Sequence, residues 1–155
     1  MKILVCSDSH GSGSNLCSAV ERERPDLVFH LGDTVRDGYN LHLACPDLRI
    51  EQVAGNCDYR GQAPLEKTLV LEGCRIVLCH GHEYYVKQGY RYLAQRGREL
   101  QADMILCGHT HRPYRDTYGS LQVCNPGAIG AGPDPTYGIL TVERGAATFT
   151  IQHLS

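Results

Sequence analysis

The sequence predicts one α/β domain that covers residues 1–155. Its length suits a single domain with a buried core, because domains commonly hold roughly 100–200 residues. Short, almost continuously apolar runs recur along the chain, as expected for strands that are buried on both faces. These runs are Lys2–Cys6, Leu27–Leu31, Arg49–Val53, Arg75–Cys79 and Met104–Cys107. The segments between several of them have helical patterns, which favours α/β over an all-β fold.

The first two apolar runs flank a helical pattern. Leu16, Ala19 and Val20 recur at helical spacing within Asn15–Arg24, and Pro25 closes the segment. A strand, a helix and a second strand in this order predict a βαβ unit.

The remaining elements are shorter or less regular. We expect helices over Gly38–Ala44 and Tyr85–Leu100. Leu69–Leu71 and Arg75–Cys79 read as a hairpin, and Pro113–His153 reads as several short antiparallel strands with glycine turns.

Composition excludes several classes of function. The formal net charge is −2, so we expect no strong nucleic-acid binding. No apolar stretch approaches the roughly 20 residues of a membrane span, and no signal peptide is evident. None of the eight cysteines forms a C-x-x-C pair, which argues against a thiolate zinc site. We therefore expect a cytoplasmic protein with reduced cysteines and no membrane partner; the oligomeric state is not readable.

Polar side chains follow each of the five apolar runs. In open α/β sheets, ligands bind beyond the carboxyl ends of the strands, so these segments are expected to converge. The candidate metal ligands among them are Asp8, His10, Asp33, Asn56, His80, His109 and His111.

This donor set predicts a two-metal centre for an anionic substrate. Imidazole, carboxylate and amide donors suit Mn²⁺, our preferred ion, as well as Ni²⁺, Fe, Co²⁺ or Zn²⁺. There are too many ligands for one ion with an open position, whereas two ions about 3.5–4 Å apart would use them all. Two divalent ions outweigh the charges of Asp8 and Asp33, so the site would favour a phosphate group.

The same motifs resemble those of the calcineurin-like metallophosphoesterases, and their order and the short chain resemble the small prokaryotic phosphodiesterase branch. The matching segments run from Asp8 to Gly127: they are Asp8-Ser9-His10, Gly32-Asp33, Gly55-Asn56-Cys57-Asp58, His80-Gly81-His82, Gly108-His109-Thr110-His111 and Asn125-Pro126-Gly127. The resemblance implies two β-sheets packed as a sandwich, flanked by helices, with the metal site at the carboxyl ends of the strands.

The resemblance also implies roles for the ligands. One ion would be held by Asp8, His10, Asp33 and His111, and the other by Asp33, Asn56, His80 and His109. Asp33 would bridge the two ions, and a metal-bridging hydroxide would attack the phosphorus of a phosphate ester.

One position departs from the wider superfamily. Many members have a histidine after the motif asparagine, where it helps to protonate the leaving group; here that residue is Cys57. A thiol with a reference pKa of about 8.5 is not an obvious replacement acid, so esters with good leaving groups should be cleaved best. His82, two residues beyond the ligand His80, is the alternative acid.

Other polar residues have two interpretations each. Arg36 and Arg60 follow two motifs closely and are candidate phosphate-binding residues, although surface arginines are common. Tyr90 and its neighbouring tyrosines line a substrate pocket or pack against a helix. Asp58 orients the site or caps a turn.

Three functions remain open at this stage. The leading one is a metal-dependent phosphodiesterase, and a phosphomonoesterase on the same metals is the near rival, because surrounding loops select the ester. The third is a non-catalytic scaffold that resembles the retromer subunit of this fold. A scaffold would be expected to have lost ligands, whereas all seven are present here.

Overall fold

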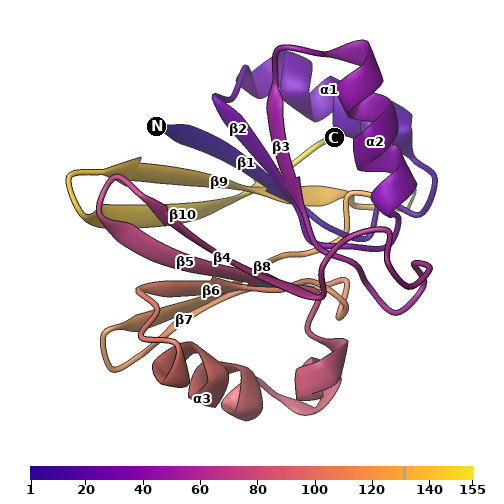
Figure 1. The fold of residues 1–155 in the computed structure, drawn as a ribbon. Coiled ribbons are helices and arrows are strands. Elements are labelled where there is room, and N and C mark those ends of the chain that lie inside the picture. The colour runs from indigo at the N-terminus through magenta and orange to yellow at the C-terminus, as the bar shows by residue number, and fades with distance from the viewer. Residues whose placement is uncertain (131) are drawn as a thin grey trace.

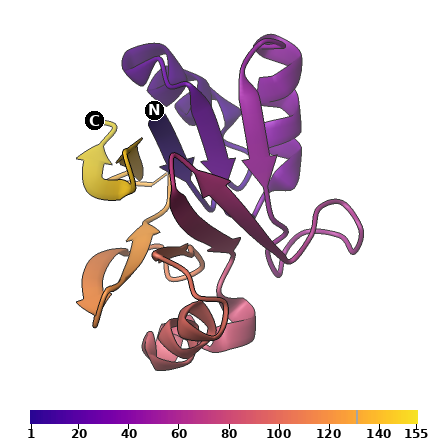
Figure 2. The same ribbon diagram turned by 60° about the vertical axis from the view of Figure 1, so that its left-hand side comes forward.

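Two five-stranded sheets face each other and enclose the main apolar core (Figure 1). This computed structural model describes residues 1–130 and 132–155; residue 131, which falls inside the expected region Pro113–His153, lies outside the description. Helices cover the outer face of each sheet, as the turned view in Figure 2 also shows. The α/β sandwich flanked by helices is therefore confirmed.

The first sheet has the strand order β10-β9-β1-β2-β3. β1 runs parallel to β2, and β2 runs parallel to β3, whereas β9 is antiparallel to both β1 and β10. The strand bounds are β1 Lys2–Cys6, β2 Leu27–His30, β3 Arg49–Gln52, β9 Thr136–Glu143 and β10 Ala146–His153.

The second sheet has the strand order β4-β5-β6-β8-β7. Its central strands β5, β6 and β8 are parallel, and β4 and β7 form antiparallel edges. The strand bounds are β4 Glu66–Leu71, β5 Cys74–Cys79, β6 Met104–Leu106, β7 Pro113–Tyr118 and β8 Leu121–Pro126.

Three α-helices lie outside the two sheets in the described chain. α1 (Gly13–Glu23) and α2 (Val35–Ala44) pack on the first sheet, and α3 (Arg91–Glu99) packs on the second. Two short 3-10 turns, η1 (His82–Tyr84) and η2 (Val86–Gln88), precede α3. None of the described helices is both long and apolar enough to cross a lipid bilayer.

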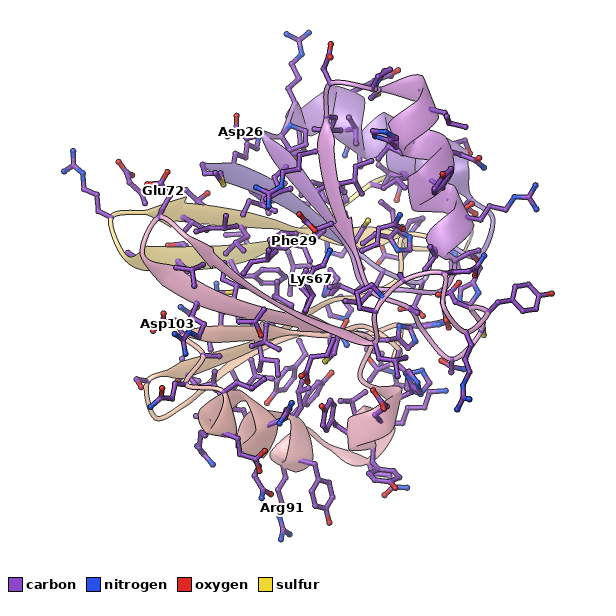
Figure 3. All side chains as sticks on the ribbon, in the orientation of Figure 1. Asp26, Phe29, Lys67, Glu72, Arg91 and Asp103 are labelled. Atoms are coloured by element: carbon purple, nitrogen blue, oxygen red, sulfur yellow. The ribbon has the colours of Figure 1, made fainter. Side chains whose placement is uncertain are left out.

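The alternation of side chains along β1 explains why both faces of the first sheet are apolar. Ile3 and Val5 point into the core between the sheets, together with Phe29, which Figure 3 labels there. Leu4 and Cys6 point the other way, into the cluster beneath α1 and α2. Because successive strand residues point to opposite faces, a continuous apolar run serves both layers.

The expected helix over Tyr85–Leu100 was wrong in its first third. Tyr85 and Gly89 have φ values of 55° and 128°, so the backbone cannot continue as a right-handed helix through them. The segment instead forms η2, and α3 begins only at Arg91.

One strand expectation also needs correction. Arg49–Val53 is not a fully buried strand, because β3 is an edge strand with partly exposed residues. Ile50 packs against the cluster beneath α1 and α2, and Val53, just beyond the strand, joins the core between the sheets. The strands of Pro113–His153 pair antiparallel with one another as expected, but β8 also runs parallel to β6, which lies before this region. α2 also begins at Val35, three residues before the expected Gly38.

Candidate metal centre

The loops that follow β1, β2, β5 and β6 are hydrogen-bonded to one another at one edge of the sandwich. The N–H of Asp8 donates to the carbonyl of Gly32 at 2.9 Å, and the N–H of His10 donates to that of Asp33 at 3.2 Å. In the second sheet, the N–H of Gly108 donates to the carbonyl of His80 at 2.9 Å. The candidate ligands therefore lie on a connected frame and not on independent loops.

Asp8, Asp33 and His80 form the buried centre of this site, with exposed fractions of 0%, 2% and 1%. His80 Nε2 lies 3.3 Å from a carboxylate oxygen of Asp33 and 3.8 Å from one of Asp8. His80 Nδ1 lies 2.8 Å from the carbonyl oxygen of Leu31. A carbonyl only accepts, so Nδ1 carries the proton and Nε2 faces the carboxylates, as second-sphere contacts of metal-binding histidines commonly arrange.

The other three candidate-ligand histidines, His10, His109 and His111, lie around this centre. His111 Nε2 lies 3.1 Å from Asp8 Oδ1, and His10 Nε2 lies 3.6 Å from the same oxygen. His109 Nδ1 faces His80 Nε2 at 3.2 Å. Asp8 thus contacts histidines from both sheets.

The ligand atoms form groups that fit divalent ions. The donor atoms of Asp8, His10 and His111 lie within 4.8 Å of one another, as do those of Asp8, Asp33 and His80. Two buried carboxylates that meet inward-facing imidazole nitrogens have the chemistry of a cation site, because buried charges are normally paired or coordinate metals. The residues present therefore fit divalent metal ions.

Electrostatics reinforce this arrangement. Burial, then the charges of His80 and Lys87, lower the pKa of His109 to about 4, which keeps the imidazole neutral and able to bind a metal. Burial alone would raise the pKa of Asp33, but His80 and the N–H of Cys57 hold it well below its usual value. Asp33 is therefore a carboxylate at neutral pH.

The position of Asn56 relative to the other candidate ligands is set through its neighbour Cys57. Its segment is bound to the site, because the N–H of Cys57 donates to Asp33 Oδ1 at 2.9 Å. The Asn56 amide is exposed and, among the contacts of the described residues, lies 3.7 Å from Cys57 Sγ. The structure thus brings Asn56 beside the expected bridging residue without a direct contact between its side chain and the other ligands.

Cys57 and His82, the two candidate acids, lie on opposite sides of the centre. Cys57 is exposed, and its sulfur lies within 4.8 Å of donor atoms of His10 and Asp33. The His82 ring is 5.5 Å from that of His80, and burial followed by the charge of His80 lowers its pKa. A lowered pKa is unfavourable for a general acid at neutral pH, so this electrostatic environment does not favour His82 in that role.

The two candidate phosphate-binding arginines do not reach the centre in this structure. Arg36 lines a separate hollow of about 570 Å³ with Tyr39 and Gln62. Arg60 is exposed in the loop after Asp58, and no contact within residues 1–130 and 132–155 joins it to the ligands.

Two residues support the ligands from beside them: Asp58, for which the sequence left two roles open, and Ser7, which was not identified from sequence. Asp58 accepts hydrogen bonds from the N–H groups of Asp33, Gly55 and Val35, at 2.9, 2.8 and 2.9 Å, so it orients the site and caps α2 together. Ser7 Oγ donates to Asp8 Oδ2 at 2.6 Å. A serine before a motif aspartate is too common in loops to signal this role.

Another support is a buried chain of polar groups. Ser9 Oγ donates to Asp37 Oδ2 at 2.6 Å and lies 2.9 Å from His30 Nε2. His30 is fully buried and has a supporting position, as expected for a histidine inside an apolar strand. Asp37 lies one residue before the helix expected from the sequence, so the sequence offered no signal for this role.

Comparison with known proteins identifies the family. The model of the calcineurin-like phosphoesterase superfamily domain matches residues 1–145. The chain belongs to this superfamily. A probable metallophosphoesterase of Bacillus subtilis, YsnB, is 33% identical, with 96% of this chain and 88% of the relative covered.

Two further matches are relevant to function. The phosphodiesterase YfcE of Escherichia coli K12 is 28% identical, with 90% of this chain and 87% of that protein covered. The zinc complex of wild-type Vps29 from Entamoeba histolytica has a TM-score of 0.77 at 20% identity, and each chain is covered completely (100%). At this identity the Vps29 likeness shows the fold alone. The family membership and the candidate metal cluster together make the chain a phosphoesterase-type hydrolase.

Proposed function

We propose that this superfamily member is a phosphodiesterase that depends on two divalent metal ions, with Mn²⁺ the preferred ion. One observation carries the proposal: two buried carboxylates, Asp8 and Asp33, lie among four histidine side chains at the edge of the sandwich. A hollow of about 410 Å³, lined by Asp8, His10 and His111 among others, opens onto them. A substrate can therefore reach the ligand atoms directly.

The ligands divide between two positions. Asp8, His10, Asp33 and His111 would hold one ion, and Asp33, Asn56, His80 and His109 the other. Bound divalent ions would supply a hydroxide nucleophile at neutral pH and neutralise the charge that grows on the phosphoryl oxygens. The His80 ring is fixed in the required tautomer by its contact with the Leu31 carbonyl.

A diester is favoured over a monoester by charge. No lysine or arginine side chain contacts a candidate ligand within residues 1–130 and 132–155. A diester carries one negative charge on its phosphate, whereas a monoester near neutral pH carries almost two and needs more cationic partners. The name of the relative YfcE points in the same direction.

The scaffold alternative is favoured only by the Vps29 likeness, and the intact donor set argues against it. A protein that no longer needed metal would be free to lose the buried carboxylates, because burying two like charges without a partner is costly. Both carboxylates and all four histidines are retained.

The test is hydrolysis of bis-p-nitrophenyl phosphate and p-nitrophenyl phosphate by metal-stripped protein. Mn²⁺, Ni²⁺, Zn²⁺ and Mg²⁺ are added back singly, and bound metal is counted by mass spectrometry. We expect metal-restored cleavage of the diester at a rate well above that of the monoester.

Two variants make the result specific. Asp33→Ala should lose both ions and the activity, whereas Asp47→Ala, which removes an exposed carboxylate elsewhere, should behave as the wild type. Binding of two ions per chain with no hydrolysis by any metal would favour the scaffold. Faster cleavage of the monoester would favour the phosphomonoesterase.

A further inference from the structure

A second hollow lies on the other side of the ligand-bearing segment 108–112. Its volume is about 540 Å³, and its wall includes Lys87, Tyr90, Thr110, Arg112 and Tyr114. Thr110 lies between the candidate ligands His109 and His111, so the two hollows share one strip of chain. We call this second hollow the η2–β7 pocket.

The η2–β7 pocket is basic, unlike the hollow at the ligands. Its lining contains two cations, Lys87 and Arg112, and no carboxylate. Both side chains are exposed, and neither the ammonium nor the guanidinium group makes an ion pair or hydrogen bond within residues 1–130 and 132–155. The hollow at the ligands instead contains Asp8 and Asp134. The side chains of the η2–β7 pocket therefore attract a negative group by themselves, whereas the hollow at the ligands would attract one only through bound metal ions.

The aromatic wall of the η2–β7 pocket is preformed. The rings of Tyr90 and Tyr114 stack with centroids 3.9 Å apart and an interplanar angle of 12°. Tyr114 Oη bonds to Tyr118 Oη at 2.7 Å, which fixes the ring from its far end. Two stacked rings held in place offer an apolar surface for a planar or sugar group at little cost in conformational entropy.

The wall is also coupled to the ligand loop through Asn125. The Asn125 amide nitrogen lies 2.9 Å from the Gly108 carbonyl oxygen, 3.0 Å from Thr110 Oγ1 and 3.3 Å from Tyr90 Oη, and its two hydrogens are shared among these acceptors. One buried side chain therefore fixes both the pocket wall and the loop that carries His109 and His111. A group bound in the pocket has a fixed position relative to the metal site.

We propose that the η2–β7 pocket binds the retained arm of a phosphodiester substrate, and that this arm carries a second phosphate. The arm is nucleotide-like: its ring lies against Tyr90 and Tyr114, and its additional phosphate is bound by Lys87 and Arg112. This inference rests on the proposed phosphodiesterase function and adds the substrate class to it. The metals would act on the scissile phosphate, and the pocket would select among esters by the chemical group on the retained arm.

A matched pair of chromogenic esters tests the inference. Thymidine 5′-(p-nitrophenyl phosphate) and its 3′-phosphorylated counterpart have the same leaving group and differ by one phosphate on the retained arm. In both, the oxygen of a water molecule bonds to the scissile phosphorus, the bond from phosphorus to the p-nitrophenyl oxygen breaks, and p-nitrophenolate leaves. The protons of the attacking water go to the medium or to the phosphate product. We expect kcat/KM of the Mn²⁺-loaded protein to be at least about tenfold higher for the 3′-phosphorylated ester, chiefly through KM.

Variants assign the preference to the pocket. Lys87→Met and Arg112→Gln should each reduce the preference about threefold, and the double variant should bring it near one. Hydrolysis of bis-p-nitrophenyl phosphate, which has no second phosphate, should stay unchanged in Arg112→Gln. The charge of Lys87 also acts on His109, so Lys87→Met and the double variant are judged by the ratio of the two thymidine esters, in which a general effect on the metal site cancels. Arg98→Gln, which removes an exposed cation from α3 outside the pocket, is the charge-matched control and should keep the preference.

The two proposals fail in different ways. A ratio near or below one in the wild type, or a preference that survives in the double variant, would overturn the role of the pocket while bis-p-nitrophenyl phosphate is still cleaved. If no ester is cleaved, calorimetric binding of thymidine 3′,5′-bisphosphate and thymidine 5′-monophosphate to the metal-loaded protein decides. Equal affinities in that measurement would also contradict the inference.

Discussion

At the hairpin end of the sandwich, left-handed residues lie in exposed turns, whereas at the metal end they are candidate ligands. The β4–β5 turn contains Glu72 and Gly73 with φ values of 49° and 81°, and the β9–β10 turn contains Arg144 and Gly145 with 49° and 80°. Glu72 is labelled in Figure 3 at the tip of its hairpin. Such turns match the twist of the strands that they connect, so the conformation is explained locally.

The metal end has no such local explanation. Positive φ values occur there at five candidate ligands: Asp8, His10, Asp33, His109 and His111. A left-handed non-glycine residue costs roughly 1 kcal/mol, and these five accumulate in one site. Every buried polar or charged residue in the described chain is also in or beside the strand ends at this edge. The backbone conformation at the hairpin end is therefore favourable for folding. At the metal end, the left-handed residues lower the stability of the fold but place the ligand side chains.

Gly55→Ala should have the largest effect of the variants that test the difference between the metal end and the hairpin end. A Cβ at Gly55 would lie 2.1 Å from Asp33 Oδ1, so the carboxylate would have to move. A misplacement of about 1 Å can cost on the order of 10²-fold in rate, or about 3 kcal/mol. We expect that loss in diester hydrolysis together with a reduced metal count, while circular dichroism stays native. Wild-type activity in this variant would show that Asp33 is not part of the centre.

Metal removal should destabilise the metal end selectively. Ions present at about 100 times their dissociation constant stabilise the native state by roughly 2.7 kcal/mol, because they bind the folded chain. Chelation should therefore lower the melting temperature by roughly 5–10 °C in a chain of this size. Calorimetric scans with and without chelator measure the shift. An unchanged melting temperature in protein that has demonstrably lost its metal would contradict the expectation.

Acid should weaken the same end through His30. Burial lowers its pKa to about 4, below the 6.5 of an unfolded histidine. Between these values the unfolded chain binds a proton that the native chain excludes, so stability falls as the pH drops from 6.5 towards 4. The contribution lost between pH 7 and pH 5 is about 2 kcal/mol. Urea unfolding of metal-free protein at both pH values measures it, and His30→Gln should show a smaller change.

The sequence predicted most of the fold and the composition of the centre for a physical reason. Buried strands and metal ligands are both encoded locally, by apolar runs such as Lys2–Cys6 and by the polar residues that directly follow them. The roles of Asp37 and Asn125 depend on contacts between distant segments, such as the bonds from Ser9 to Asp37 and from Asn125 to Gly108. No local pattern encodes those contacts. The prediction that a helix begins at Tyr85 was wrong. The apolar residues there have helical spacing, but Tyr85 and Gly89 have positive φ values that interrupt a right-handed helix.

Cys57→His tests whether position 57 at the metal end affects the reaction and not the folding of the protein. Cys57 is exposed beside Asp33 and His10, so a histidine would have access to a bound ester. In an alkyl p-nitrophenyl diester, either the alkoxide or p-nitrophenolate can leave. An added proton donor should raise the rate of alkoxide loss by about tenfold and the rate of p-nitrophenolate loss much less. Product analysis by chromatography measures both rates. An equal acceleration of both would show that leaving-group protonation is not the limiting deficiency.

Gly145→Ala tests the hairpin end and should have the smallest effect. A Cβ there meets open space, so the cost is only the left-handed backbone at φ 80°, about 1 kcal/mol of unfolding free energy. The variant should keep its metal content and diester activity, with the same loss of stability whether metal is present or not. A loss of activity would mean that the two ends are coupled.

The position of β1 between β9 and β2 has a consequence for synthesis on the ribosome. β1 is translated before β9, yet Lys2 pairs with Thr141, and the loop of Asp8 is held by the N–H groups of Ile129 and Gly130. All seven candidate ligands have been translated before β9, which completes the first sheet, exists. Until then the nascent chain exposes an unpaired apolar strand edge, the kind of surface that chaperones cover and that invites aggregation. High-level expression at reduced temperature, which slows elongation and weakens hydrophobic association together, should raise the soluble yield.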